Sequence, residues 1–414
     1  MNPLHPGAGR DDLSDLLPRF DLRGMDLSLE RMQEALRELQ HPAAEIPAVQ
    51  VVGTNGKGSI ACFLHHALMA AGLRSGLTIS PHLLSWCERI RVNERLITIE
   101  KLRCLLQTLQ PVVTTCRLTP FEQLICAAMV HFEAERPDWL VLEAGLGGRL
   151  DATTAHPHRR LIAVGSIGLD HREHLGATLE EIAAEKAAAI PPGSHVVSAA
   201  QLPEVQRVLE HSAAAMHASL RWVEPLANDW TLGLPGGLQR SNAAVAWAAL
   251  EWIGRDINTQ ITVDAIRKGF AAARWPGRLQ WMQWHGRPVR VDGAHNPPAA
   301  AALANERCRW LAADQAQIWV LAIQAHKQAP EMLKHLLQPN DLAWIVPVPE
   351  HRSWSLEQLQ LDAPELAHQL RGAADATGAL TQLEHDGWPQ VAPVVAGSLY
   401  LIGHLLETHQ LQAE

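Results

Sequence analysis

The residues best suited to chemistry lie in the segment "GTNGKGS", residues 53–59, between an apolar run and a helical pattern. Glycines let backbone N–H groups turn toward an anion, and a helix that starts there adds the positive end of its dipole. Lys57 would supply a mobile charge, and Ser59 a hydroxyl for a phosphate or metal ion. Because a glycine separates Lys57 from Ser59, the segment departs from the usual phosphate-binding loop. It predicts a phosphate site, with an ordinary strand-to-helix turn as the alternative.

A carboxylate, Glu143, stands near the end of the apolar run 139–144, and a glycine-rich stretch follows it. Burying a carboxylate costs several kcal/mol unless a cation or hydrogen bonds compensate. A metal ion near a triphosphate would compensate for the cost of burying Glu143. The alternative is that Glu143 caps the next segment.

The stretch after the apolar run 161–167 holds four metal-binding side chains, Asp170, His171, Glu173 and His174. The two histidines are good zinc ligands, but no further nearby Cys or His completes a tetrahedral set. An oxygen-rich setting beside a phosphate loop favours Mg²⁺ with one imidazole ligand. A solvated loop is the alternative.

Further along the chain, Asp292, His295 and Asn296 follow another apolar run, just before a helix that is expected from about Pro298. Polar groups at that place can hold a base, a ribose or a phosphate. In isolation, such an Asp-Gly turn would mean little.

Short β-branched runs alternate with longer alanine- and leucine-rich patterns, which predicts a mostly parallel sheet with helices on both faces. Expected strands are 48–52, 76–80, 139–144, 161–167 and 195–199, and expected helices are 28–40, 121–135, 178–190 and 241–253. After a boundary within 271–290, the strands 289–294, 318–323, 342–348 and 393–398 predict a second, smaller α/β domain. Ligands are expected at the carboxyl ends of the strands.

Composition narrows the class of protein. The 414 residues are 47% hydrophobic, enough for two domains, and the net charge of -9 gives no support for a nucleic-acid partner. The six cysteines form no C-x-x-C pair and lie in apolar stretches, so reduced, buried thiols are expected. The N-terminal segment lacks an apolar signal region, and no run approaches the roughly 18 apolar residues of a membrane helix. We expect a soluble cytoplasmic protein without a membrane partner.

Separate signatures along nearly the whole chain occur in the order and spacing of one family. They are "GTNGKGS" (53–59), "SPHL" (80–83), "ERIRVN" (88–93), "TPFE" (119–122), "EAGLGGRLDAT" (143–153), "SIGLDHREHLGATLEEIAAEK" (166–186), "PGR" (276–278), "DGAHNP" (292–297) and "GSLYLIG" (397–403). The chain thus resembles the bifunctional bacterial type of the folylpolyglutamate synthase and dihydrofolate synthase family, in the Mur ligase superfamily. The altered loop looks like this superfamily's own P-loop.

The resemblance implies an α/β fold with an N-terminal P-loop ATPase-like Mur ligase central domain and a smaller C-terminal Rossmann-like domain. Residues 1–274 would form the ATP- and pterin-binding domain, and residues 275–414 the C-terminal glutamate-ligase domain. The implied enzyme is an ATP-dependent acid–amino-acid ligase. It would add L-glutamate to dihydropteroate, to reduced folates such as tetrahydrofolate, or to both, through an acyl phosphate. Mg²⁺ is the implied metal and a monomer the expected state.

The resemblance also implies roles for individual residues. ATP would be bound by Thr54, Asn55, Gly56, Lys57, Gly58, Ser59, Asn242, Arg278, Asp292 and His295. Mg²⁺ would be bound by Ser59, Ser80, Glu143 and His171, and the pterin by Phe121, Asp151 and Ala152. The catalytic residues would be Lys57, His171 and Lys186. Lys186 matches a lysine that is carbamylated in the family, although its pattern alone suggests an exposed helix lysine.

The chain departs from the family's pattern at three places. Thr154 follows "LDAT" where Asn is frequent, and Leu238-Gln239 replaces His-Gln before Asn242. His326-Lys327-Gln328 replaces Asp-Lys-Asp, which leaves open any role of those aspartates in binding glutamate or closing the domains. None of these changes removes an expected metal or phosphate contact.

Two other functions fit part of the pattern. A nucleotide-binding regulator with a degenerate ligase fold would not need Lys57, Glu143, His171 and Lys186 together. A sister ligase acting on a peptidoglycan or cyanophycin precursor is disfavoured by the pterin-site matches and by the length, because cell-wall ligases carry an additional N-terminal domain. The sequence does not distinguish one folate activity from both, and it does not give the length of the polyglutamate product.

Overall fold

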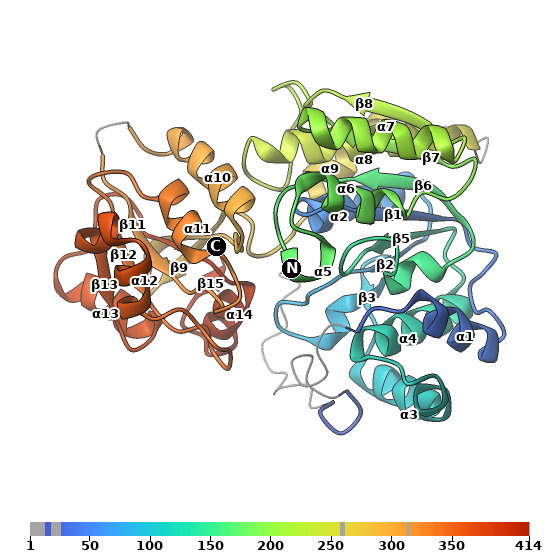
Figure 1. The fold of residues 1–414 in the computed structure, drawn as a ribbon, viewed down its shortest axis with the longest axis horizontal. Helices are drawn as coiled ribbons and strands as arrows, with labels where there is room; N and C mark the ends of the chain where they lie inside the picture. Colours follow the sequence, from blue (N-terminus) through green and yellow to red (C-terminus); the bar gives the residue numbers. More distant parts are fainter. Residues whose placement is uncertain (1–12, 18–25, 257–260, 313–314, 414) are drawn as a thin grey trace. The chain divides into compact units, whose positions relative to one another are not determined.

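The protein is described by a computed structural model that covers residues 13–17, 26–256, 261–312 and 315–413 (Figure 1). The chain divides into two compact units, each built around one sheet. Unit 1 comprises Met1–Ile167, His171–Gly233 and Arg240–Ala273, and unit 2 comprises Gly168–Asp170, Leu234–Gln239 and Arg274–Glu414. Two short segments of the first part of the chain therefore pack with unit 2.

The described strands of unit 1 form an eight-stranded sheet in the order β4-β3-β2-β5-β1-β6-β7-β8. Their bounds are β1 Ala48–Val52, β2 Ser75–Thr78, β3 Ile90–Val92, β4 Arg95–Leu96, β5 Trp139–Glu143, β6 Arg159–Val164, β7 His195–Ala199 and β8 Ser219–Val223. The pairings along β2-β5-β1-β6-β7-β8 are all parallel. At one edge of the sheet, β3 pairs antiparallel with β2 and with β4. The central strand β1 is buried on both faces, as its apolar residues predict.

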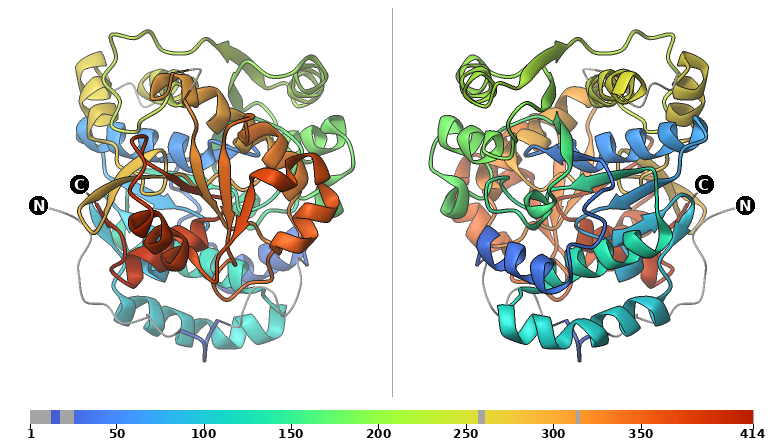
Figure 2. Two further views of the ribbon diagram at one scale, coloured as in Figure 1. Left: turned by 90° about the vertical axis from the view of Figure 1, so that its left-hand side faces the viewer. Right: turned by 90° about the vertical axis from the view of Figure 1, so that its right-hand side faces the viewer.

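Helices cover both faces of this sheet. They are α1 Leu29–Glu38, α2 Lys57–Ala70, α3 Ile99–Cys116, α4 Pro120–Glu135, α5 Arg172–Leu175, α6 Leu179–Ala187, α7 Pro203–Ala215, α8 Leu238–Asp256 and α9 Val263–Ala272, with short 3₁₀ helices η1 Trp86–Arg89 and η2 Ala152–Ala155. Figure 2 shows α2 on one side of the sheet and α3 with α4 on the other. Most of α2 is buried, so the helix after the phosphate loop is a core element.

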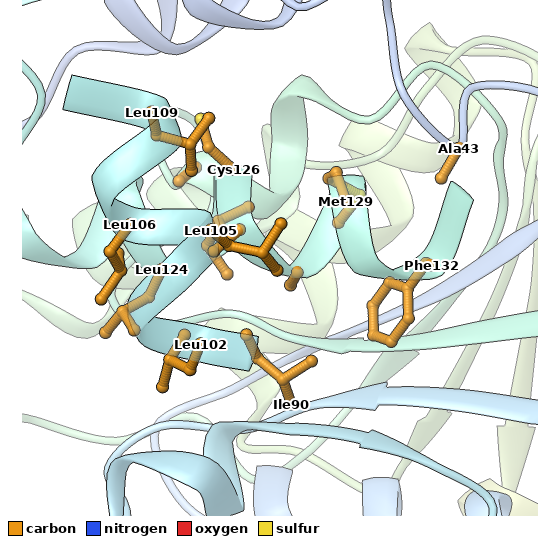
Figure 3. Close-up of a cluster of buried hydrophobic side chains, with 14 of the residues drawn as sticks. Ala43, Ile90, Leu102, Leu105, Leu106, Leu109, Leu124, Cys126, Met129 and Phe132 are labelled. Atoms are coloured by element: carbon orange, nitrogen blue, oxygen red, sulfur yellow. The ribbon is translucent and has the colours of Figure 1, made fainter. Parts of the chain in front are cut away.

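The core on the second side lies between α3, α4 and β5 (Figure 3). Leu106 of α3, Met129 and Phe132 of α4, and Leu140 and Leu142 of β5 are almost completely buried there. Burial of each large side chain contributes roughly 1.5–3 kcal/mol of transfer free energy. This packing fixes α4 and β5, which carry candidate site residues at their ends.

Unit 2 contains a seven-stranded sheet in the order β13-β12-β11-β14-β10-β9-β15. The strands are β9 Gln280–Trp284, β10 Arg287–Val291, β11 Ile318–Leu321, β12 Leu342–Ile345, β13 Leu370–Gly372, β14 Val394–Ala396 and β15 Gln412–Ala413. The helices are α10 Pro297–Glu306, α11 Ala329–Leu336, α12 Leu356–Asp362, α13 Ala376–His385 and α14 Leu399–Glu407, with 3₁₀ helices η3 Arg307–Arg309 and η4 Pro364–Gln369. β9 runs antiparallel to β10 and β15, and the other pairings are parallel.

The sequence predicted the buried parallel strands within a few residues, and β1 and β7 match their expected bounds. It missed the antiparallel strands β3, β4, β9 and β15, and the parallel edge strands β8 and β13. The expectation of buried thiols was wrong for Cys104 and Cys308, which are exposed, whereas the other four cysteines are buried. No helix in the described part of the chain is long and apolar enough to cross a membrane.

Two buried histidines of unit 1 predict a loss of stability in acid. Burial, with a smaller effect of Arg91, lowers the pKa of His65 to about 3, and burial lowers the pKa of His156 to about 4. The unfolded chain, with a histidine pKa near ~6.5, therefore binds more protons than the folded chain as the pH falls. The free energy of unfolding should fall from about pH 6.5 to about pH 4, by an amount on the order of a few kcal/mol.

Urea unfolding followed by tryptophan fluorescence measures this dependence. His156→Gln removes one of the protonation sites, so its stability should depend less steeply on pH than that of the wild type. His211→Gln, at an exposed position of α7, is the control. Equal pH slopes for wild type and His156→Gln would contradict the assignment.

Candidate active site

The phosphate-loop segment turns sharply between β1 and α2. Gly53 and Gly56 have φ values of 146° and 84°, in the region that favours glycine. A side chain on Gly53 would also lie 3.0 Å from the Cα of Gly165, just after β6. Helix α2 then begins at Lys57. Its N-cap is Gly56, so no N-cap side chain bonds to the first amides of the helix. The loop therefore lies at the carboxyl ends of β1 and β6, where a parallel sheet binds ligands.

Backbone bonds and a lysine hold this loop. The amides of Thr54 and Asn55 donate to the carbonyl of Ser166 at 2.8 and 3.1 Å. The Lys57 ammonium donates to the carbonyls of Gly53 and Thr54 at 3.1 and 3.2 Å. Lys57 is half-buried in this position. The positive charge is held over the loop itself.

Three further expected ATP ligands lie at the end of this loop or beside it. Ser59, in the first turn of α2, is 3% exposed, and Gly58 beside it is buried. The side chain of Asn242, on α8, approaches so closely that a Cβ on Gly56 would lie 2.5 Å from its Oδ1. Only glycine at position 56 therefore leaves room for Asn242.

The expected metal ligands Glu143 and Ser80 are hydrogen-bonded to each other at the carboxyl ends of the neighbouring strands β5 and β2. Glu143, which ends β5, is 5% exposed, and its carboxylate accepts from the backbone N–H of Ser80 at 3.1 Å. Arg89 donates to the Ser80 hydroxyl at 3.2 Å and to Nδ1 of His82 at 2.8 Å. The sequence reading contained Arg89 in "ERIRVN" but gave it no role. Burial lowers the pKa of His82 to about 3, with Arg89 as the second cause.

The four candidate metal-binding residues after β6 have different surroundings. His171 is the left-handed N-cap of α5 in unit 1, and Asp170 packs with unit 2. Asp170 accepts from the Lys327 ammonium and from the Asn296 amide, both at 2.7 Å. The Nε2 of His174 lies 3.9 Å from the preceding carboxylate. No three His, Cys, Asp or Glu residues in the described ranges are grouped as a metal site.

This arrangement also gives a role to the lysine that the segment His326-Lys327-Gln328 retains from the family pattern. Lys327, the centre of His326-Lys327-Gln328, is 5% exposed and forms a buried ion pair with Asp170. A buried charge requires such a partner. The sequence reading missed this pair because the two residues lie far apart in the chain.

The glycine-rich stretch after β5 lies against the end of α6. Lys186, in the last turn of α6, is 3% exposed, so the pattern-based alternative of an exposed lysine is wrong. A side chain on Gly148 would lie 2.8 Å from the Lys186 carbonyl oxygen. The Arg149 amide donates to the Glu185 carbonyl at 2.9 Å. Burial disfavours the ammonium form of a lysine, which favours its reaction as an amine.

The three expected pterin ligands lie at the same glycine-rich stretch: Phe121 packs against it, and Asp151 and Ala152 follow it in the chain. The half-buried ring of Phe121, on α4, packs against Gly145, where a Cβ would lie 2.6 Å from its Cζ. Ala152 is buried at the start of η2. An aromatic ring over a glycine leaves a flat face that can stack on a ligand ring.

Asp151 is the N-cap of η2 and stabilises the stretch from inside. Its carboxylate accepts from the Leu146 amide at 3.0 Å, and from the amide and hydroxyl of Thr153 at 2.9 and 2.5 Å. Burial raises the pKa of Asp151, and these hydrogen bonds oppose that shift. A structural role therefore accompanies any contact with a ligand.

In unit 2, the expected nucleotide ligands gather at the end of β10. The Asp292 carboxylate accepts from the amides of Leu279 and Ala294 at 2.9 and 2.8 Å. Burial raises the pKa of Asp292, and the charge of Arg278 opposes this shift. Burial lowers the pKa of His295 to about 4. His295 is therefore neutral near pH 7 and can act as a hydrogen-bond donor or acceptor.

Known proteins resemble this chain in both sequence and fold. The family model described as "Dihydrofolate synthetase, C-terminal domain" matches residues 279–408. The dihydrofolate synthase/folylpolyglutamate synthase of Bacillus subtilis is 31% identical over 412 residues, which covers 92% of this chain and 95% of the relative. The chain belongs to this family. It is thus an ATP-dependent ligase, as the sequence reading predicted.

Solved structures of family members share the fold. A bifunctional folylpolyglutamate synthase/dihydrofolate synthase from Yersinia pestis, complexed with AMPPNP and a Mn ion, matches with a TM-score of 0.82 and 28% identity, over 97% of this chain and 100% of that one. E. coli FolC in complex with DHPP and ADP matches with a TM-score of 0.81 and 27% identity, over 97% and 99% of the two chains. The predicted two-domain, Mur ligase-like α/β architecture is confirmed.

Proposed function

We propose that the chain joins the amine of L-glutamate to the carboxyl group of dihydropteroate, of a reduced folate such as tetrahydrofolate, or of both. The observation that carries this proposal is the phosphate loop after β1 beside the buried Glu143, which ends the neighbouring strand β5. The name of the Bacillus subtilis relative and the complex of the E. coli protein with DHPP and ADP support the substrate class.

In the proposed reaction, a carboxylate oxygen of the pterin substrate attacks the γ-phosphorus of ATP, and ADP leaves. The glutamate amine then attacks the acyl phosphate carbon and loses a proton, inorganic phosphate leaves, and an amide remains. Catalysis of this kind depends on alignment and charge stabilisation. Lys57 and the N-terminus of α2 would bind the phosphate oxygens.

We assign nucleotide-binding residues within each unit. In unit 1 these are Thr54, Asn55, Gly56, Lys57, Gly58, Ser59 and Asn242, and in unit 2 Arg278, Asp292 and His295. The buried Asp292 and the neutral His295 have the chemistry to bind hydroxyl or amine groups of a nucleotide. Within this proposal, residues 1–274 carry ATP and pterin binding, and residues 275–414 form the glutamate-ligase domain.

We assign the metal ligands as Ser59, Ser80, Glu143 and His171. This set offers one carboxylate, two hydroxyls and one imidazole. The described part of the chain contains no group of three His, Cys, Asp or Glu residues that could hold a metal ion by themselves. Mg²⁺ suits such a set, because it keeps waters and phosphate oxygens among its ligands. When bound, it would neutralise charge on the phosphates. The Mn ion in the Yersinia pestis structure supports a divalent cation.

Glu143→Ala and His171→Ala should each raise the Mg²⁺ concentration needed for half-maximal activity, because each removes a proposed ligand. Titration of Mg²⁺ in a glutamate-dependent ADP-release assay measures this. Added Zn²⁺ should restore neither variant, and His174→Ala is the matched control. Zinc that copurifies with the wild type and is released by both changes would overturn the magnesium assignment.

Lys186 would carry a carbamate in the active protein. Its side chain is 3% exposed, and burial favours the neutral form of a lysine amine, which is the form that reacts with CO₂. The product is an anion that can accept hydrogen bonds or contact the metal, whereas an ammonium group cannot.

The pterin would be bound by Phe121, Asp151 and Ala152. The ring of Phe121 against Gly145 and the buried carboxylate of Asp151 support stacking and hydrogen bonding to a heterocycle. We further propose a monomer in the cytoplasm, a reducing compartment that suits the free thiols of Cys104, Cys116, Cys126 and Cys308.

Glutamate-dependent ADP release tests the proposed function. ADP should form only when L-glutamate and either dihydropteroate or a reduced folate are both present, because the acyl phosphate should form in a closed, water-poor site. Rapid ATP hydrolysis without either substrate would point to the nucleotide-binding regulator or to a plain ATPase. Comparing the two acceptors decides between one folate activity and both.

A further inference from the structure

We propose that Gln50, in the middle of β1, is a positioning residue that sets the glycine-rich loop between the pterin and Lys186 sites. It would act through Arg159, Thr153 and Thr154, none of which contacts the reacting groups in the proposed mechanism. The loop is residues 145–151. This inference concerns the same site as the proposed function and rests on it for its effect on catalysis.

Gln50 is completely buried, and its side chain has partners at both ends. Its Oε1 accepts from Nη1 of Arg159 at 2.7 Å. Its Nε2 donates to the hydroxyl oxygens of Thr153 and Thr154, both at 2.8 Å. A guanidinium group only donates hydrogen bonds, so the amide oxygen must face Arg159 and the amide nitrogen must face the threonines.

This orientation fixes the direction of the next bonds. Each threonine hydroxyl accepts a hydrogen from Gln50, so its own single hydrogen is available for another acceptor. The Thr154 hydroxyl donates to the carbonyl of Gly148 at 2.6 Å, and the Thr153 hydroxyl donates to the Asp151 carboxylate at 2.5 Å. Both hydrogens are therefore directed into the loop.

The loop in turn contacts both proposed substrate-side residues. Gly148 packs against the backbone of Lys186, and Gly145 packs against the ring of Phe121. Asp151 also accepts from the amide of Leu146, so one carboxylate joins the two ends of the loop. A shift of the loop would move the surfaces that place Lys186 and the pterin.

The same chain of bonds starts on the strand that ends at the phosphate loop. Gln50 lies three residues before Gly53, the first residue of the phosphate loop. Its side chain belongs to the hydrogen-bond network, and the chain that follows it forms the phosphate loop. The polar groups are buried, with Thr153 completely buried and Thr154 8% exposed. Since a buried, incompletely satisfied network is costly, reversing one member should disturb the loop.

Gln50→Glu tests the donor and acceptor directions of these hydrogen bonds while the volume of the side chain stays nearly constant. A carboxylate beside Arg159 stays ionised and only accepts, so the threonine hydrogens should turn toward residue 50 and away from the loop. Thr154→Val removes one hydroxyl without changing the side-chain shape, and Thr154→Ser retains it. Thr78→Val is the matched control, because the buried Thr78 hydroxyl has no hydrogen-bond partner among the described residues.

Steady-state kinetics should separate positioning from general damage. For Gln50→Glu and Thr154→Val we expect kcat/KM for the pterin acid to fall by a factor on the order of 10 to 100, with the KM for ATP changed by no more than about twofold. Thr154→Ser and Thr78→Val should remain close to the wild type. Equal losses toward ATP and the pterin acid, or no loss beyond that of Thr78→Val, would overturn the proposal.

Hydrogen exchange of the ligand-free protein gives a readout that does not depend on activity. Amides of residues 145–154, including those of Leu146 and Thr153, should exchange faster in Gln50→Glu and Thr154→Val, whereas those of α2 should not. Unchanged exchange in the loop would refute the positioning role. If the wild type forms no amide, the proposed function fails, but the exchange experiment still decides whether Gln50 sets the loop.

Discussion

Lys186→Ala is expected to nearly abolish amide formation while leaving the fold and ATP binding largely intact. The side chain is buried at the end of α6, and the proposed carbamate is the group that alanine cannot supply. Alanine itself is favourable in a helix. Glutamate-dependent ADP release measures the loss, and added acetate or formate should restore part of the activity by filling the vacated carboxylate position.

Two controls sharpen this experiment. Chloride at equal ionic strength should not rescue Lys186→Ala, and Lys268→Ala, which removes an exposed helix lysine from α9, should behave like the wild type. Carbon NMR with labelled bicarbonate should detect a carbamate in the wild type and not in Lys186→Ala. A fully active Lys186→Ala variant would rule out the assignment whatever the spectra show.

Lys57→Ala is expected to reduce turnover by a factor on the order of 10² or more, as follows when a preorganised charge on a transferring phosphoryl group is lost. The ammonium group is already held over the loop by the carbonyls of Gly53 and Thr54. Losing these two bonds should cost stability of only about 1–3 kcal/mol. Turnover at saturating substrate and thermal unfolding measure the two effects separately.

Near-normal turnover of Lys57→Ala would return the segment to an ordinary strand-to-helix turn. Arg240→Ala, at an arginine of α8 that donates to the Ala227 carbonyl, is a control for the loss of one positive charge in unit 1. It should leave the KM for ATP close to that of the wild type.

The sequence predicted the central parts of the fold because buried parallel strands are continuous apolar runs. β1 and Glu143 at the end of β5 followed directly from such runs, and so did the position of the phosphate loop. The antiparallel strands β3 and β9 escaped because their short sequences mix polar and apolar residues.

The arrangement of side chains around the candidate site was less accessible. The local helix pattern suggested that Lys186 is exposed, whereas the fold buries its side chain and packs its backbone against Gly148. The pairing of Asp170 with Lys327 joins distant segments, and no local pattern encodes it. The role of Arg89 beside Ser80 likewise depends on tertiary contacts. Residue types thus predicted which groups take part, whereas long-range packing determined their partners.

The distribution of thiols gives the protein a natural pair of reporter positions. Cys104 is exposed on α3 of unit 1 and Cys308 is exposed in η3 of unit 2, whereas the other cysteines are buried. Because a thiol must meet the reagent to react, maleimide dyes should label these two positions first. Energy transfer between a donor and an acceptor dye would then follow the separation of the two units as nucleotide and glutamate are added, without any engineered cysteine.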